Sequence, residues 1–144
     1  MTSKDLLLTL AFFLLFGAGA TAQSSPVGIW KTIDDQTGEA KSHVEIYQKD
    51  GRYYGKVVRL LQSDPEAICE KCPGDKQGQP VLGMEVLWNL QAYQDYWSYG
   101  QIMDPENGKT YKCSLWLEGN DRLKVRGYIG ISMLGRTQDW HRVK

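Results

Sequence analysis

The sequence predicts an all-β protein that forms a single antiparallel up-and-down barrel of about eight short strands. Several runs of β-branched and aromatic residues alternate with polar ones, and helical periodicity is almost absent. Turn signals rich in Gly, Asn, Asp and Pro separate these runs at short intervals. Short connections favour pairing of sequential strands, and eight such strands can close into a barrel without exposed edges. An open two-sheet sandwich is the alternative.

The first 22 residues have the features of a signal peptide. Lys4 precedes an apolar run over 6–16, and small residues with an Ala-x-Ala ending follow up to Ala22. A membrane-spanning helix needs about 20 apolar residues, and this run is shorter. We therefore predict cleavage after Ala22, an exported protein, no stable membrane insertion after cleavage, and a barrel domain over 23–144.

Three strands are predicted in the first part of the domain. They cover 27–33, 42–47 and 53–61, and in the second of them Ser, Val and Ile alternate with His, Glu and Tyr. Asp50 and Gly51 lie between the second and the third strand and are a strong hairpin signal. This part of the chain therefore predicts a three-stranded antiparallel meander.

Five more strands are predicted after a long connection. They cover 81–90, 97–103, 111–117, 123–129 and 135–143. The first of these runs also fits a short helix. Pro and Asn-Gly over 104–108, and Gly-Asn-Asp over 119–121, predict tight turns. We expect these strands to pair with their neighbours in sequence.

Residues near the two ends of the domain predict how one end of the barrel closes. Gly28 and Trp30 lie on the first predicted strand, and Trp140 and Arg142 lie on the last. A Gly-x-Trp on the first strand and an Arg on the last are typical of lipocalin-like barrels. We expect Trp30 to pack under Arg142 in a cation–π contact worth about 0.5–2 kcal/mol. These residues favour the closed barrel over the sandwich.

The sequence resembles the family of small secreted bacterial proteins called domain of unknown function 2147. The blocks that carry the resemblance are Gly28–Asp35, Asp104–Tyr111, Val125–Gly130 and Gly135–Trp140. The Cys69-x-x-Cys72 pair and the segment 80–84 resemble one branch of that family. The resemblance covers nearly the whole mature chain and implies a lipocalin-like β fold. It also implies export across the inner membrane of a Gram-negative bacterium, to the periplasm or beyond. It brings no established activity and therefore no catalytic residue.

The long predicted connection over 62–80 contains Cys69 and Cys72. In an oxidising compartment we expect a disulfide between them, which closes a small loop worth about 2 kcal/mol. A link to Cys113 would contribute about 4 kcal/mol but requires Cα atoms within about 7 Å. A redox-active pair and a zinc site completed by Cys113 and a histidine are further alternatives. We expect Cys113 to be free and buried, and no metal or cofactor to be bound.

Charge and motifs exclude several classes of function. The chain has 17 basic and 17 acidic residues, so its balanced charge does not indicate a nucleic-acid partner. It contains neither a Gly-x-Ser-x-Gly motif nor a glycine-rich phosphate loop. Asp34 and Asp35 are adjacent, so on a strand their side chains would point to opposite faces, and we expect them to begin a turn. We therefore predict that the protein is not an enzyme.

Aromatic and basic residues give the main candidates for ligand binding. The domain contains five Trp and eight Tyr. The candidate ligand contacts are Trp97, Arg126, Tyr128 and Arg136. If the strand face that carries Arg126 and Tyr128 points inward, these residues would meet a carboxylate or phosphate head group above an apolar cavity; if it points outward, they form a solvated face. We predict a small apolar or amphipathic ligand. An envelope structural or interaction protein with a filled barrel is the alternative, and the sequence leaves the oligomeric state open.

Overall fold

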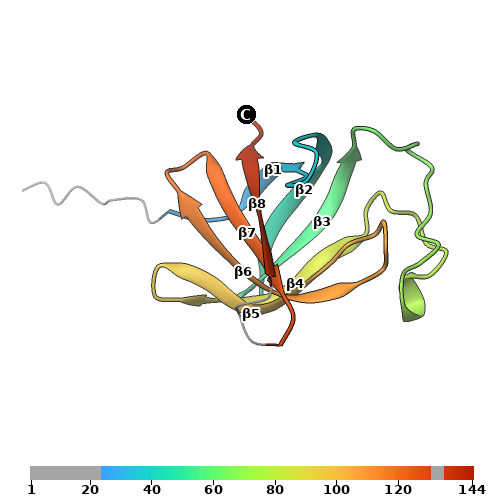
Figure 1. Ribbon diagram of the computed structural model, residues 1–144. Coiled ribbons are helices and arrows are strands. Elements are labelled where there is room, and N and C mark those ends of the chain that lie inside the picture. The colour runs from blue at the N-terminus through green and yellow to red at the C-terminus, as the bar shows by residue number, and fades with distance from the viewer. Residues whose placement is uncertain (1–23, 131–134) are drawn as a thin grey trace, which may run out of the picture.

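The computed structural model describes residues 24–130 and 135–144, and the predicted signal peptide over 1–22 lies outside the described residues. The described chain forms one closed barrel in which each strand pairs antiparallel with the next (Figure 1). The strands are β1 (Gly28–Ile33), β2 (Ala40–Lys49), β3 (Arg52–Leu60), β4 (Glu85–Tyr93), β5 (Tyr96–Met103), β6 (Thr110–Glu118), β7 (Arg122–Tyr128) and β8 (Gly135–Arg142).

The first and last strands close the barrel by pairing with each other. Trp30 lies opposite Arg142 and Lys31 lies opposite His141 across the antiparallel β1–β8 ladder. The predicted fold class, a closed eight-stranded up-and-down barrel, is confirmed, and the open sandwich is wrong. In the described part of the chain, no helix is long and apolar enough to cross a membrane.

Most predicted strands begin and end within two residues of their observed bounds, but β4 differs more. The prediction placed a strand or a short helix from residue 81, whereas β4 begins at Glu85. The backbone of Val81 is used elsewhere, because its N–H donates to the carbonyl of Ala67 at 2.9 Å within the long β3–β4 connection. The connection therefore extends to Met84 and includes a single 3-10 turn, η1 (Gly74–Lys76).

The connections between strands lie at two ends of the barrel, because successive strands run in opposite directions. One end, here the closed end, carries the short turns β2–β3, β4–β5 and β6–β7. At the β2–β3 turn Asp50 and Gly51 have φ values of 52° and 75°, as a type I′ turn requires, which agrees with the hairpin predicted at this dipeptide. The other end, here the open end, carries the connections β1–β2, β3–β4, β5–β6 and β7–β8.

The packed core occupies the half of the barrel next to the closed end. Large side chains on inward-facing strand positions are completely buried there: Trp30, Ile46, Leu90, Leu115 and Leu123. Two or four residues further along the same strands, toward the open end, the inward-facing side chains are smaller or polar and line a cavity. The interior is therefore filled at one end and hollow at the other.

Candidate functional site

The closed end is held by a contact between Trp30 and Arg142. The guanidinium carbon of Arg142 lies 4.2 Å from the centre of the Trp30 ring. The indole N–H of Trp30 donates to the carbonyl of Pro26 at 2.8 Å. A Cβ at Gly28, where φ is 143°, would lie 2.5 Å from Nη1 of Arg142, so this position requires glycine. The guanidinium also donates to three backbone carbonyls, those of Ser25, Val27 and Asn120.

The open half of the barrel contains a cavity of about 650 Å³. Strand alternation explains its walls, since Leu123, Val125 and Gly127 face inward on β7 and only the last two line the cavity. The apolar lining residues on the strands include Val44, Val57, Val86, Ile102, Met103, Val125 and Trp140. Two hydroxyl groups, those of Thr32 and Ser42, also line it and share a hydrogen bond of 2.9 Å.

One wall of the cavity carries a chain of hydrogen bonds that runs from its interior to its mouth. The indole N–H of Trp140 donates to Oε1 of Gln138 at 3.0 Å. The amide of Gln138 donates in turn to Oδ1 of Asp35 at 3.4 Å. Arg136 completes the chain by donating from Nε to Oδ2 of Asp35 at 2.9 Å and from Nη2 to Oδ1. All four residues line the cavity, so hydrogen-bonding groups extend along this wall from the interior to the mouth.

Two turns at the mouth have the same hydrogen-bond pattern. Asp34 begins the β1–β2 turn, and its Oδ1 accepts from the backbone N–H groups of Gln36 at 2.8 Å and Thr37 at 3.0 Å. These bonds hold the pKa of Asp34 below its ordinary value. Asp104 begins the β5–β6 turn, and its Oδ1 accepts from the N–H of Glu106 at 2.9 Å. Burial outweighs this bond and raises the pKa of Asp104.

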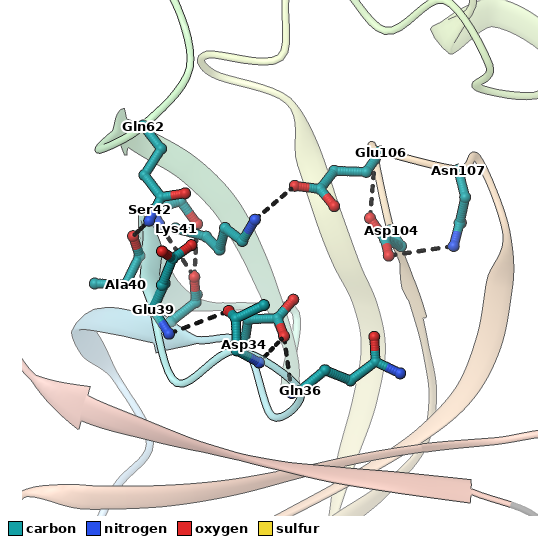
Figure 2. Close-up of polar contacts among 12 residues, drawn as sticks. Asp34, Gln36, Glu39, Ala40, Lys41, Ser42, Gln62, Asp104, Glu106 and Asn107 are labelled. Atoms are coloured by element: carbon teal, nitrogen blue, oxygen red, sulfur yellow. Dashed lines mark hydrogen bonds and ion pairs between the residues drawn. The ribbon is translucent and has the colours of Figure 1, made fainter.

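Two ion pairs connect different elements around the mouth. Lys41 reaches from β2 to Glu106 of the β5–β6 turn, with 3.4 Å between Nζ and Oε1 (Figure 2). Arg136 of β8 pairs with Asp35 of the β1–β2 turn. The Arg136 guanidinium holds the pKa of Asp35 below its ordinary value, and Asp35 in turn raises the pKa of Arg136. The cationic groups of Lys41 and Arg136 are therefore already neutralised by carboxylates.

The long β3–β4 connection forms one side of the mouth and lies beside the β5–β6 turn (Figure 1). The predicted disulfide between Cys69 and Cys72 is present, with Cα atoms 5.5 Å apart and both residues buried. Sγ of Cys69 lies 3.3 Å from the carbonyl oxygen of Pro105. A Cβ at Gly108 would lie 1.8 Å from the carbonyl oxygen of Lys71, so only glycine allows this approach. The disulfide loop thus packs directly on the turn.

The third cysteine has no part in this loop. Cys113 is completely buried on β6 and is free, as predicted, and burial raises the pKa of its thiol. A link between Cys113 and either cysteine of the connection is therefore wrong. Within residues 24–130 and 135–144, no group of three or more His, Cys, Asp or Glu side chains is placed to hold a metal ion.

The structure separates the four candidate ligand contacts into two pairs. Tyr128, the last residue of β7, and Arg136, near the start of β8, both line the cavity near its mouth. Arg126 does not line it, because Val125 and Gly127 occupy the inward-facing positions on either side. The side chain of Arg126 therefore points outward, with Nη1 3.4 Å from the hydroxyl of Thr137 on the neighbouring strand. Tyr128 borders the cavity although it is two residues further on, because β7 ends there at the mouth.

Trp97 also does not line the cavity but belongs to the packed core. Its ring packs edge-on against Tyr53, with 5.9 Å between ring centres. Its indole N–H is buried and has no hydrogen-bond acceptor among the described residues. Trp140, expected at the closed end, instead faces the cavity, one inward position away from Arg142 on β8.

Several cavity residues were not identified from the sequence, although the signal for some was available. Counting back in steps of two from the buried Trp140 along β8 reaches Gln138, which was missed, and then Arg136, which was already a candidate. Counting forward in the same way from Trp30 along β1 reaches Thr32. Asp104 carries no such signal, because it follows the end of β5 and is placed by the fold of its turn.

These features define a lipocalin-like barrel, closed at one end and hollow at the other. The family model for uncharacterized proteins conserved in bacteria, domain of unknown function 2147, matches residues 28–142. The chain belongs to this family, as the sequence blocks indicated. A search of the curated proteins found no match to the sequence.

A solved structure has the same fold. It is that of protein HP1028 from the human pathogen Helicobacter pylori, which is described as belonging to the lipocalin family. The two chains superpose with a TM-score of 0.74 over 83% of this chain and 84% of the other, at 19% sequence identity. At this identity the likeness establishes the lipocalin-like fold alone.

Proposed function

We propose that the protein is an exported binding protein that holds a small apolar or amphipathic molecule in the open half of its barrel. The observation that carries the proposal is the cavity of about 650 Å³ with its apolar floor and polar mouth. Ligand pockets in proteins typically measure about 300–1,000 Å³ and combine apolar walls with a few polar groups. An apolar tail would lie against the floor, and a polar head group would lie at the mouth.

A glycine on the cavity wall supports this proposal. Gly127 faces inward on β7, and a Cβ there would lie 3.4 Å from Cβ of Tyr111 and 3.6 Å from Cγ2 of Ile102, which is ordinary van der Waals contact. A methyl group would therefore fit, and glycine within a strand is unfavourable because it packs nothing and costs entropy. Glycine at this position keeps space open, as a binding cavity requires and a filled barrel does not.

Two further observations, the disulfide and the lack of a recognised catalytic motif, support export and binding rather than catalysis. Disulfides persist in oxidising compartments, so the Cys69–Cys72 bond favours export to the periplasm or beyond. The sequence contains no motif of an activated nucleophile. Binding rather than catalysis is therefore the activity that we propose.

Ligand titration followed by tryptophan fluorescence tests the proposal. Trp140 lines the cavity, whereas Trp116 lies on an outward-facing position of β6. Single-chain alcohols of increasing length should change the fluorescence and raise the melting temperature through linkage. Affinity should rise with length by at most about 0.8 kcal/mol for each methylene buried. Trp140→Phe should remove the fluorescence change, and Trp116→Phe should retain it.

A variant that fills the cavity provides the decisive comparison. In Gly127→Leu the Cβ meets no clash and the outer atoms of the side chain point into the cavity. This variant should bind the alcohols at least about tenfold more weakly because its side chain occupies their volume. Arg126→Met, one residue away and facing outward, is the matched control and should bind normally. Unchanged binding by Gly127→Leu would place the ligand outside the barrel. Native mass spectrometry of protein purified from its own cell envelope would then identify the natural ligand.

A further inference from the structure

We propose that the mouth of the cavity selects amphiphiles by the charge of their head group, binding a cationic head most tightly and an anionic head most weakly. This inference rests on the proposed function, since it concerns the ligand that the cavity holds. It differs from the sequence-based expectation of a carboxylate or phosphate head group, which depended on an inward-facing Arg126 and Tyr128.

The basic side chains around the mouth offer little to an anionic head group. Arg136 directs Nε and Nη2 to the carboxylate of Asp35, at 2.9 Å for the first of these contacts. Lys41 directs its ammonium group to Glu106 at 3.4 Å. An anionic head group would therefore have to compete with the carboxylate that already pairs with Arg136 or with Lys41.

Carboxylates remain in excess after these pairs are made. Among the described residues that line the cavity, five carboxylates face three basic groups. Asp34, Glu70 and Asp104 make no ion pair within the described part of the chain, whereas Lys71 is the one lining cation left without such a pair there. The mouth therefore has an excess of two negative charges, although the whole chain is formally neutral.

Of the carboxylates at the mouth, Asp104 is the one whose charge should affect a bound head group most. Its side chain is partly buried at the mouth, and among the described residues its carboxylate accepts only from the N–H of Glu106 and the amide of Asn107, at 2.9 Å and 3.3 Å (Figure 2). Burial disfavours its charged form, which agrees with the raised pKa. A cationic head group would bring a further positive charge close to this carboxylate, and an anionic one would add to the repulsion.

The head group must lie near these charges because of the shape of the cavity. The apolar residues, such as Val44, Val57 and Val125, lie on inward-facing strand positions next to the packed core, and the charged residues lie at the open end. At about 5 Å in a water-like dielectric, one unit charge changes the affinity of another about fourfold. Reversing the head-group charge against a net negative mouth therefore predicts at least about a tenfold difference in affinity.

Three probes with the same twelve-carbon chain test the inference: dodecylamine, dodecanol and laurate, each below its micelle concentration. Tryptophan fluorescence and displacement of a neutral dye should rank the affinities as amine, alcohol, laurate, with at least about tenfold between the first and last at low salt. Salt screens exposed charges, so the ratio should shrink in about 0.5 M salt.

Two variants locate the effect. Asp104→Asn combined with Glu70→Gln should reduce the ratio of amine to laurate affinity severalfold, because it removes two of the excess charges and keeps the Oδ1 acceptor of the turn. Glu70 is exposed and makes no hydrogen bond among the described residues, so the single variant Glu70→Gln should fold normally and test the same effect. Asp50→Asn, in the distant β2–β3 turn, is the matched control and should leave the ratio unchanged.

The outcomes separate this inference from the proposed function. Laurate binding as tightly as the amine would overturn the inference and leave the proposed function standing. A ratio that falls equally in Asp50→Asn would also overturn it, since the preference would then reflect overall charge and not the mouth. No binding of any of the three probes would overturn both.

Discussion

The contact between Arg142 and Trp30 should be a principal source of stability at the closed end, and its loss gives the most direct test of the fold. Trp30 is completely buried, and the Arg142 guanidinium covers its ring at 4.2 Å. The same guanidinium donates to the carbonyls of Asn120, Val27 and Ser25 at 2.7, 2.9 and 3.1 Å. It thereby joins the N-terminal segment, the β6–β7 turn and the last strand.

These contacts set the expected loss in the free energy of unfolding for each substitution. Trp30→Ala removes a large core side chain and should cost about 3–5 kcal/mol. Arg142→Ala should cost less, about 2–3 kcal/mol, because hydrogen bonds from a charged group are worth about 1.5–3 kcal/mol each and part of this is recovered when the carbonyls bind water. The direct cation–π contact should appear as a coupling of about 0.5–2 kcal/mol between the two substitutions.

A double-mutant cycle measured by urea unfolding isolates this coupling. The wild-type protein, Trp30→Ala, Arg142→Ala and the double variant should give free energies of unfolding that are not additive. Lys144→Ala is the control, since this cation lies at the same end with its side chain 77% exposed, and it should change stability little. Additivity within about 0.3–0.5 kcal/mol would refute the reasoning, because residues in contact should couple.

Three further predictions concern the open end and the thiols. Non-reducing peptide mapping of the purified protein should link the two cysteines of the β3–β4 connection and leave Cys113 unreactive until the protein unfolds. A peptide that contains Cys113 in a disulfide would contradict this. Gly108→Ala should destabilise more than Gly38→Ala, by about 1–3 kcal/mol, because both positions have positive φ but only the former meets a backbone carbonyl. The pairing with Arg136 lowers the pKa of Asp35 in the folded state from 3.8, so it stabilises the fold above that pH, and this stabilisation is lost as the pH falls through the folded value. In a plot of the urea-unfolding midpoint against pH, Asp35→Asn should therefore flatten the acid side. An unchanged plot would contradict the ion pair.

The sequence by itself determined the fold class, the closing contact and the disulfide loop. Strand alternation and turn chemistry are local properties, so the hairpin turn at Asp50-Gly51 and most strand bounds could be predicted directly from the sequence. The contact of Trp30 with Arg142 joins distant positions, but it follows once the first and last strands are known to pair.

The tertiary structure alone decided which residues form the candidate site. A shift of one residue moves every side chain of a strand to the other face, so the pattern of β7 left the direction of Arg126 open until its pairing with both neighbours was fixed. The pairing of Asp35 with Arg136 spans 101 residues and depends on the closure of the whole barrel. The cavity likewise depends on what all the strands place inside, which no single strand specifies: large side chains at the closed end, and small or polar ones such as Gly127 and Thr32 toward the mouth.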